Sequence, residues 1–369
     1  MNAVDTKIRA KGKQAGLLLA LRRQIVDGVL LPGQQLPTRR QLEQTFQVSS
    51  PTLQRAVDQL VRDGFVTPLH GRGTYVAANP PHLCNYALIF PHYPGTERLV
   101  SPTGIIAQPF VRFWTAMVDV AMDIQRAGAK KIPVYYGVDG HVDAEDYQSL
   151  LRDIEAHRLA GLIFATPPFL LTGTPILEEP GLPRVAVMET TTMPGIPAIT
   201  LVAASFIERA VGYLASIGCK RIAFLGVPAH VESMPLWEAE LAAHGMSTRP
   251  YWQQFVGPAT PQLARNCAHG MVHENQRIRP DALVITDDNL VEYATAGVVD
   301  AGVKVPGEMQ LVAHCNFPSP TVSVLPARRL GFDASRVVRA CLESIDQQRR
   351  GETPPVSVFV PAQFEEELN

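Results

Sequence analysis

Short apolar segments alternate with longer amphipathic segments between residues 86 and 313, and this alternation leaves the chain few possible folds. Buried strands are predicted at 86–90, 132–136, 161–165, 184–188, 221–225, 282–286 and 310–313. Helices are predicted between them at 110–128, 144–157, 206–217, 236–244 and 290–301. This order predicts a doubly wound α/β arrangement of parallel sheets, whose ligands bind beyond the carboxyl ends of the strands. Because nearly 290 residues exceed what one such sheet needs, we expect two lobes with a cleft between them.

The first 78 residues have a different pattern. Helical spacing and capping residues predict three helices, at 15–27, from Thr38 to Phe46, and from Ser49 or Ser50 to Gly64. Two alternating segments, 65–67 and 74–76, then enclose a glycine-containing turn and predict a hairpin. Three helices followed by a hairpin predict a small winged helix-turn-helix domain, which places its third helix in a DNA major groove.

Charge divides the chain at the same place. Residues 1–78 carry 11 Lys and Arg against 5 Asp and Glu, whereas the remainder carries 22 against 30. A basic head on an acidic body indicates that the head meets a polyanion. We therefore expect a DNA-binding domain at 1–78, a linker at 79–84 that begins around Pro80-Pro81, and a two-lobed body at 85–369.

The sequence contains neither a signal-peptide pattern nor an apolar run of about 18 residues, so we expect a cytoplasmic protein with no membrane partner. The five cysteines are scattered and form no C-x-x-C, which argues against a disulfide framework or a zinc ribbon. His269 and His273 lie one helical turn apart and could form a metal pair, but no further ligand has a suitable spacing. We expect no metal, no cofactor and no catalytic residues.

The segment GVLLPGQQLPTRRQLEQTFQVSSPTLQRAVDQLVRDGFVTPLHGRGTYV resembles the DNA-binding domain of the GntR family of bacterial transcription regulators. The family pattern G-x-L-x-P-G, L-P-S/T-x-R-x-L, V-S, T-V/L and G-x-G-T-Y/F-V is met in order. The resemblance implies that Arg40 contacts the DNA backbone and groove and that Thr52 contacts a phosphate. It also implies that Gly71, Gly73 and Thr74 form a wing tip that approaches the minor groove.

Two positions depart from that family, because arginine is frequent where Ser50 and Gln54 stand here. Gln54 could still pair with an adenine through two hydrogen bonds. Nearby cations remain for DNA contacts or, alternatively, for a solvated helix face: Arg39, Arg55 and Arg72. A nucleotide-phosphate loop at 71–73 is disfavoured, since a strand rather than a helix follows it.

The body resembles the effector domain of the LacI family, which has the periplasmic sugar-binding-protein fold. The likeness rests on AVGYLASIGCKRIAFLG and on ALVITDDNLVEYATAGVVDAGVKVPGEMQLVAH. It implies that Asp287 and Asp288 face the cleft and that Asn316 lies beside the family's aspartate position, here Cys315. The family's arginine falls at Ser233 or Met234, and its Asp-Asn pair falls near 202–203, so three of its polar anchors are absent.

Aromatic residues near the predicted cleft could stack on an apolar ligand face, although such residues are more often core. We predict ligand roles for Trp114 and Trp237, and with less weight for Phe90, Tyr93, Phe110 and Phe113. His92 follows the first strand of the body in a loop that suits binding.

The sequence thus predicts a ligand-responsive transcription regulator, specifically a repressor. As a homodimer it would bind double-stranded operator DNA, under the control of a small-molecule effector that is a sugar or a related metabolite. An alternative interpretation is an enzyme or a solute-binding protein in which the head has a minor role. The absence of a signal-peptide pattern disfavours the solute-binding version.

Overall fold

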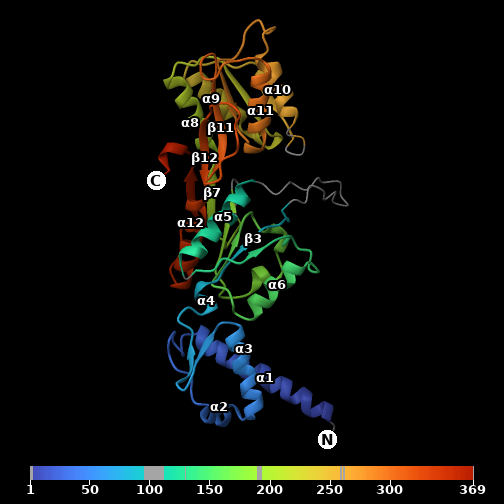
Figure 1. Ribbon diagram of the computed structural model, residues 1–369, viewed down its shortest axis with the longest axis vertical. Coiled ribbons are helices and arrows are strands. Elements are labelled where there is room, and N and C mark those ends of the chain that lie inside the picture. The colour runs from blue at the N-terminus through green and yellow to red at the C-terminus, as the bar shows by residue number, and fades with distance from the viewer. Residues whose placement is uncertain are drawn as a thin grey trace.

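The computed structural model describes residues 3–94, 112–128, 130–188, 193–257, 260 and 262–368, with residues 3–11 described by their backbone alone. Three bodies follow one another along the long axis in Figure 1: a small head, a first lobe and a second lobe. No helix within the described ranges is both long and apolar enough to span a bilayer.

The head contains three helices and a hairpin. Its elements are α1 (Ala3–Val26), α2 (Arg39–Phe46), α3 (Ser50–Arg62), β1 (Val66–Leu69) and β2 (Gly73–Val76). The hairpin pairs Val66 with Val76 and Leu69 with Gly73. Apolar residues from all three helices and both strands form one buried cluster, among them Leu21, Leu53 and Phe65. The predicted winged helix-turn-helix arrangement is therefore confirmed.

Local chemistry fixes where these helices begin and end. Thr38 caps α2 in a capping box with Gln41, because each residue's side chain meets the other's backbone N–H. Ser49 is the N-cap residue of α3, but its hydroxyl lies 3.0 Å from the hydroxyl of Thr52 and makes no capping bond to the backbone. Gly64 follows the end of α3 with φ +78°, which favours glycine over any other residue.

Lobe 1 is built on a six-stranded parallel sheet in the order β13-β7-β6-β5-β3-β4. Its strands are β3 (Tyr86–Ile89), β4 (Val134–Tyr135), β5 (Gly161–Phe164), β6 (Arg184–Met188), β7 (Ala198–Val202) and β13 (Ser357–Pro361). Its helices are α4 (Pro81–Cys84), α5 (Arg112–Ala127), α6 (Glu145–Glu155), η1 (Phe169–Leu171), α7 (Pro175–Glu178) and α12 (Ala334–Arg349).

Lobe 2 has a sheet in the order β14-β12-β11-β10-β8-β9, parallel except for the edge strand β14. Its strands are β8 (Ile222–Gly226), β9 (Gln253–Phe255), β10 (Ala282–Ile285), β11 (Gln310–Phe317), β12 (Arg328–Asp333) and β14 (Gln363–Phe364). Its helices are α8 (Ala203–Ser216), η2 (Pro228–Ser233), α9 (Met234–Ala243), η3 (Pro250–Trp252), α10 (Leu263–Val272), α11 (Asp288–Asp300) and η4 (Glu365–Glu367).

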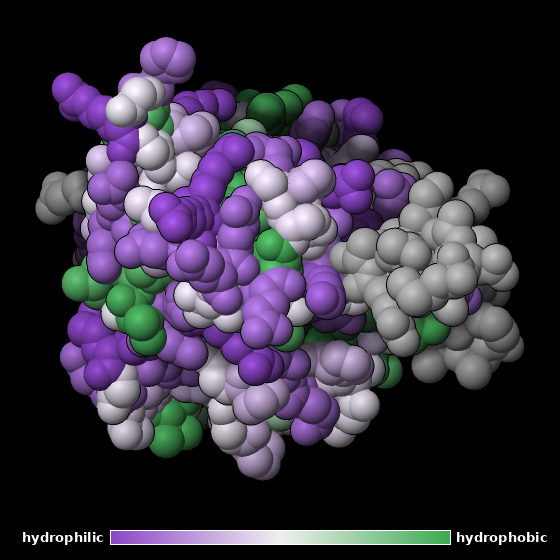
Figure 2. Space-filling model, turned by 90° about the horizontal axis from the view of Figure 1, so that it is seen from below, coloured by the Kyte–Doolittle hydropathy of each residue, from purple (hydrophilic) through white to green (hydrophobic). Residues whose placement is uncertain are grey.

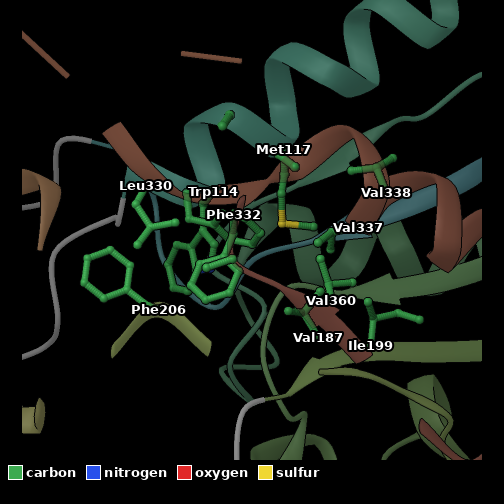
Figure 3. Packing of buried hydrophobic residues seen from close by; sticks show 14 of the residues in the cluster. Trp114, Met117, Val187, Ile199, Phe206, Leu330, Phe332, Val337, Val338 and Val360 are labelled. Carbon is green, nitrogen blue, oxygen red and sulfur yellow. The ribbon is translucent and has the colours of Figure 1, made fainter. Parts of the chain in front are cut away.

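The chain passes between the lobes three times. It leaves lobe 1 where β7 meets α8, returns where β12 meets α12, and leaves again between β13 and β14. One buried apolar cluster extends along these crossings and includes Trp114, Phe206, Phe332 and Val360 (Figure 3). The two-lobed arrangement of parallel sheets predicted from the strand-helix alternation is confirmed.

Several elements were not predicted: β7, β9, α12 and the strands β12, β13 and β14. Strands β12 and β13 include arginine, proline or exposed positions, so their apolar runs are too short to stand out. Their pairing partners are distant in sequence; Val358, for example, pairs with Ile199. These strands depend on tertiary context more than on local propensity.

Gly331 should be indispensable to lobe 2. A Cβ atom at this position of β12 would lie 1.8 Å from the carbonyl oxygen of Cys315 on the neighbouring strand β11, and this backbone atom cannot rotate away. We expect Gly331→Ala to lower the free energy of unfolding of lobe 2 by about 2–4 kcal/mol. Urea unfolding followed by the fluorescence of Trp237 and Trp252, both buried in this lobe, would measure it.

Gly307→Ala is the matched control, since its Cβ would meet only Lys304 Cβ at an ordinary 3.8 Å. We expect a change within about 1 kcal/mol for this variant. Equal losses in the two variants would contradict the proposed clash at Gly331.

Candidate nucleic-acid interface and ligand site

The beginnings of α2 and α3 are joined by side-chain hydrogen bonds. Arg39 donates to Gln54 Oε1, and Gln54 Nε2 donates to Asp58 Oδ1 at 2.6 Å. Both ends of the Gln54 amide are therefore engaged within the head. Pairing of Gln54 with a base would require it to exchange these partners.

Other predicted DNA-contacting residues differ in exposure. Ser50, Arg40 and Arg55 are exposed, whereas Thr52 is buried and its hydroxyl faces that of Ser49. In the part of the chain that the structure describes, no hydrogen bond or ion pair engages the guanidinium groups of Arg40 and Arg55. These two cations can thus approach a phosphate without breaking an existing contact.

Gln35 supports the wing turn at 70–73. Gln35 Nε2 donates to the carbonyl oxygen of Arg72 at 2.7 Å, and a Cβ on Gly73 would lie 2.6 Å from that same Nε2. Gly71 and Gly73 have φ values of +70° and +104°. Arg72 is exposed, Thr74 is partly buried, and the Arg72 guanidinium makes no hydrogen bond or ion pair to any described residue.

The head-end surface is mostly hydrophilic, and its hydrophobic residues form small separate areas (Figure 2). Such a surface, together with a head that carries 11 basic and 5 acidic residues, suits a hydrated polyanion better than an apolar protein partner.

A second group of polar side chains follows the strands of lobe 2. His230, after β8, has its Nδ1 2.8 Å from the hydroxyl of Thr286, which follows β10. Burial lowers the pKa of His230, so its imidazole is neutral at pH 7. Asp287 caps α11 by accepting from the backbone N–H of Asn289 at 2.9 Å.

Asp288 is a buried carboxylate at the start of α11, with 3% of its surface exposed. Asn316 Nδ2 donates to its Oδ2 at 2.6 Å, and Thr321 lies at 3.5 Å from the same oxygen. Burial raises the pKa of Asp288, and the nearby Asp287 adds to that rise while His314 opposes it. The predicted residues Asp287, Asp288 and Asn316 are therefore brought together at the carboxyl ends of β10 and β11.

Aromatic and imidazole rings pack together at the corresponding end of lobe 1, where Phe90 and Trp114 are buried. The His92 ring centroid lies 6.0 Å from that of Trp114, which in turn lies 5.6 Å from that of Phe90. In lobe 2, the ring of His314 lies 5.4 Å from Phe206. The buried Nδ1 atoms of His92 and His314 have no hydrogen-bond partner within the described structure, so both could still accept or donate one.

Two hydrogen bonds connect the lobes close to this region. Arg112 Nε, at the start of α5, donates to Asn289 Oδ1 at 3.1 Å. Ser319, beyond the end of β11, donates to Asp119 Oδ2 on α5 at 3.0 Å. Movement of one lobe against the other must alter both bonds.

The remaining predicted aromatic residues are arranged differently. Trp237 is fully buried and packs edge-on against Phe224 at 5.1 Å in the core of lobe 2. Phe113 is buried in the same apolar cluster as Trp114, whereas Phe110 lies outside the described residues. His269 and His273 do meet, with ring centroids 4.9 Å apart, but within the described ranges no set of three or more metal-ligating side chains forms.

Two family models match the chain. Residues 14–76 match the bacterial regulatory proteins of the gntR family, and residues 211–362 match the periplasmic binding protein-like domain. The chain joins a gntR-family helix-turn-helix domain to a periplasmic-binding-protein-like domain.

Two curated relatives are similar to this chain over a stretch about as long as the gntR-type head. The mannosyl-D-glycerate transport/metabolism system repressor MngR of Escherichia coli is 43% identical over 56 residues, which are 15% of this chain and 23% of that protein. The transcriptional repressor NagR of Bacillus subtilis is 39% identical over 57 residues, covering 15% and 24% of the two chains. The likeness thus spans about a quarter of each relative.

Solved structures resemble the body. A LacI transcriptional regulator from a Rhodococcus species matches with a TM-score of 0.54 and 17% identity, over 76% of this chain and 96% of that one. A LacI family regulator from Lactobacillus casei with bound glucose matches with a TM-score of 0.52 and 14% identity, over 76% and 98%. At this level of identity the likeness establishes the fold of the periplasmic-binding-protein-like body.

His230 and His314 were not among the predicted ligand residues. His230 lies on a short 3₁₀ helix after β8. It does not directly follow the strand, so the sequence did not mark it as a ligand residue. His314 lies within β11, a strand that continues four residues beyond the predicted end at Ala313. His314 directly follows the predicted strand end at Ala313, so the rule that ligands bind beyond strand ends would have identified it there.

Asp288 should limit stability at neutral pH. A carboxyl group whose pKa is raised in the folded state stabilises the fold at pH values below its ordinary pKa. That contribution is lost as the pH rises through the pKa of the folded state. Asn cannot ionise and can still accept from Asn316. We expect Asp288→Asn to have a higher melting temperature than the wild type at pH 7, with the difference shrinking as pH falls towards 4.

Calorimetry of both proteins between pH 4 and pH 8 would measure the effect. Asp300→Asn is the control at the other end of α11, where Arg265 lowers the pKa of an exposed carboxylate. That variant should be no more stable than the wild type. A destabilised Asp288→Asn at pH 7 would instead show that the charged carboxylate is favourable as it stands.

Proposed function

We propose that the protein is a DNA-binding transcription regulator, acting as a repressor, whose affinity for an operator is controlled by a small molecule bound between the lobes. The observation that carries this proposal is the gntR-type head, in which Arg40, Arg55 and Arg72 are exposed cations whose guanidinium groups make no hydrogen bond or ion pair to any described residue. Curated relatives of this head are named as repressors. The proposed role requires no catalysis, and its place is the cytoplasm, where bacterial DNA lies.

The proposed DNA contacts divide into two kinds. Arg40, Thr52, Arg72 and the wing glycines would hold the backbone or the minor groove, which gives salt-dependent affinity with little sequence information. Ser50, Gln54 and Arg55, near the beginning of α3, would face base edges. Arg39 would act through Gln54, since it fixes one end of that amide.

The proposed effector site lies between the lobes. His92 and Trp114 would contribute from lobe 1, and Asp287, Asp288 and Asn316 from lobe 2, joined by His230 and His314. An aromatic ring on one side and hydrogen-bonding groups on the other suit a sugar or a related polar metabolite. Trp237 is fully buried, so its predicted ligand role would rest on its indole N–H group. This group has no hydrogen-bond partner among the described atoms.

We further propose a homodimer. One small head reads one half-site, so two heads carried by a symmetric pair of bodies would read a pseudo-palindromic operator. An effector can change the DNA affinity only if it binds the two arrangements of the lobes with different affinities. The interlobe bonds Arg112–Asn289 and Asp119–Ser319 are contacts in which those arrangements would differ.

Removal of single phosphate contacts should weaken DNA binding uniformly across sequences. We expect Arg40→Ala and Arg72→Ala each to lower the slope of log affinity against log salt concentration by about 1. Electrophoretic shifts with duplexes selected from a random library, at several salt concentrations, would measure this. Arg62→Ala is the control, because this exposed arginine of α3 bonds to Gln59 at the end of the helix away from Ser50. If the wild type selects no sequence, the regulator proposal is wrong.

A ligand for the interlobe site should be detectable by thermal stabilisation. We expect a compound from a panel of sugars, polyols and nucleosides to raise the melting temperature of the wild type, and Asp287→Ala and His314→Ala to weaken its binding about tenfold or more, because each removes a polar contact. Glu292→Ala, an exposed residue on the outer part of α11, should leave binding unchanged. Stabilisation that survives in both site variants would place the ligand elsewhere.

A further inference from the structure

Asp63, the residue that directly follows α3, forms an ion pair with lobe 1. Asp63 caps the end of α3, and its side chain is 3% exposed. Its Oδ2 accepts from Arg22 of α1 at 2.5 Å, and its Oδ1 accepts from Gln59 at 2.9 Å and from Arg158 of lobe 1 at 3.1 Å. One buried carboxylate is therefore shared by the head and the body.

Arg158 is itself held in place by lobe 1. Its other terminal nitrogen, Nη2, lies 2.5 Å from Asp153 Oδ1 on α6, and the second oxygen of Asp153 accepts from the hydroxyl of Tyr135 on β4. Arg158 stands three residues before β5, a central strand of the lobe 1 sheet. Its guanidinium thus bridges two carboxylates, one belonging to each body, with well-defined geometry.

The chain connection next to this bridge is packed rather than loose. Of residues 79–84, which the sequence predicted to be a linker, 81–84 form α4, and Pro80, Pro81 and Cys84 are buried. His82 stacks on Phe65 of the head with ring centroids 5.9 Å apart and an interplanar angle of 11°. Arg349 of α12 donates to the carbonyl oxygen of Leu83 at 3.2 Å.

We propose that Arg158 is a positioning residue for DNA recognition: by binding Asp63 it fixes the orientation of α3 relative to lobe 1, and so fixes the spacing of half-sites that the protein accepts. The packed connector holds the head at one side, and a second contact, 95 residues away in sequence, opposes rotation of the head about that side. Arg158 is not needed to neutralise Asp63, because Arg22 already pairs with it inside the head.

This inference rests on the proposed function, since it assumes a dimer that reads two half-sites. Two heads in fixed orientations match one spacing, and any other spacing must be met by deforming the protein or the DNA. Two heads on free connectors tolerate many spacings and gain less from the correct one, because the effective concentration of the second head is spread over more positions.

The experiment compares a single half-site with paired half-sites whose spacing is varied one base pair at a time, using duplexes selected by the wild type. We expect Arg158→Ala to bind the single half-site within about twofold of the wild type. Spacing changes that cost the wild type about tenfold or more should cost this variant less than about twofold. Arg158→Lys, which keeps one cation near Asp63, should restore part of the spacing preference.

Arg152→Ala provides the matched control, since Arg152 is exposed on the neighbouring helix α6 and makes no side-chain hydrogen bond or ion pair with the described residues of the head. It should keep the wild-type profile. Limited proteolysis gives an independent readout: segment 77–80 should be cleaved faster in Arg158→Ala than in Arg152→Ala, because the head is released from lobe 1.

The possible outcomes separate the two proposals. If the wild type binds no selected duplex, the proposed function fails. If the wild type binds but shows no spacing preference, or if Arg158→Ala keeps the wild-type spacing profile, the positioning role is overturned while the regulator proposal stands. Loss of single half-site binding in Arg158→Ala would also overturn it, because the residue would then support the head itself.

Discussion

The three passages of the chain between the lobes determine where every other part of the body can lie. Because β7, β12 and β13 each end at a passage, the carboxyl ends of both parallel sheets are directed towards the same region. Polar side chains that follow different strands, such as His92 and Asp288, are thereby placed around one interlobe region although they are far apart in sequence. The shared apolar cluster that runs along the passages, which includes Phe206 and Phe332, limits how far the lobes can separate without exposing it.

The head depends on a different kind of force. Its apolar core is small, and an ion pair between Arg22 and Asp63 is buried beside that core, with the guanidinium 5.4 Å from the ring of Phe65. A buried pair contributes little net stability but strongly disfavours arrangements in which either charge is left alone. Asp63 therefore specifies how α1 and α3 meet, and Arg158 extends the same requirement to the surface of lobe 1.

Much of this architecture follows from local sequence. The capping residue Thr38, the helix end at Gly64 and the hairpin around Gly71 and Gly73 are set by backbone chemistry, and each was predicted within a few residues. The strands of the body were predicted where four or more apolar residues run together, as at 184–188. The polar pair Asp287 and Asp288, at the end of such a strand, was implied by the resemblance to the LacI family.

The features that sequence could not supply depend on contacts between distant residues. Nothing near Arg158 indicates Asp63 as its partner, and an arginine before a strand is usually a solvated residue. The same holds for His230, whose partner Thr286 is 56 positions away. Trp237 shows the opposite case: a tryptophan near a predicted cleft is attractive as a ligand residue, but only tertiary packing shows that Phe224 covers it.

The position of β5 suggests how the interlobe region and the head could communicate. This strand begins at the end of lobe 1 that carries Arg158 and finishes at the opposite end with Phe164. There Phe164 pairs with β3, the strand that leads to His92. A strand paired on both sides moves as part of its sheet and not by itself, so lobe 1 would transmit a rotation to the head as a rigid body. Coupling of this kind needs no chain of altered side chains, but it requires that the head cannot turn independently, and the bridge from Arg158 to Asp63 meets that requirement.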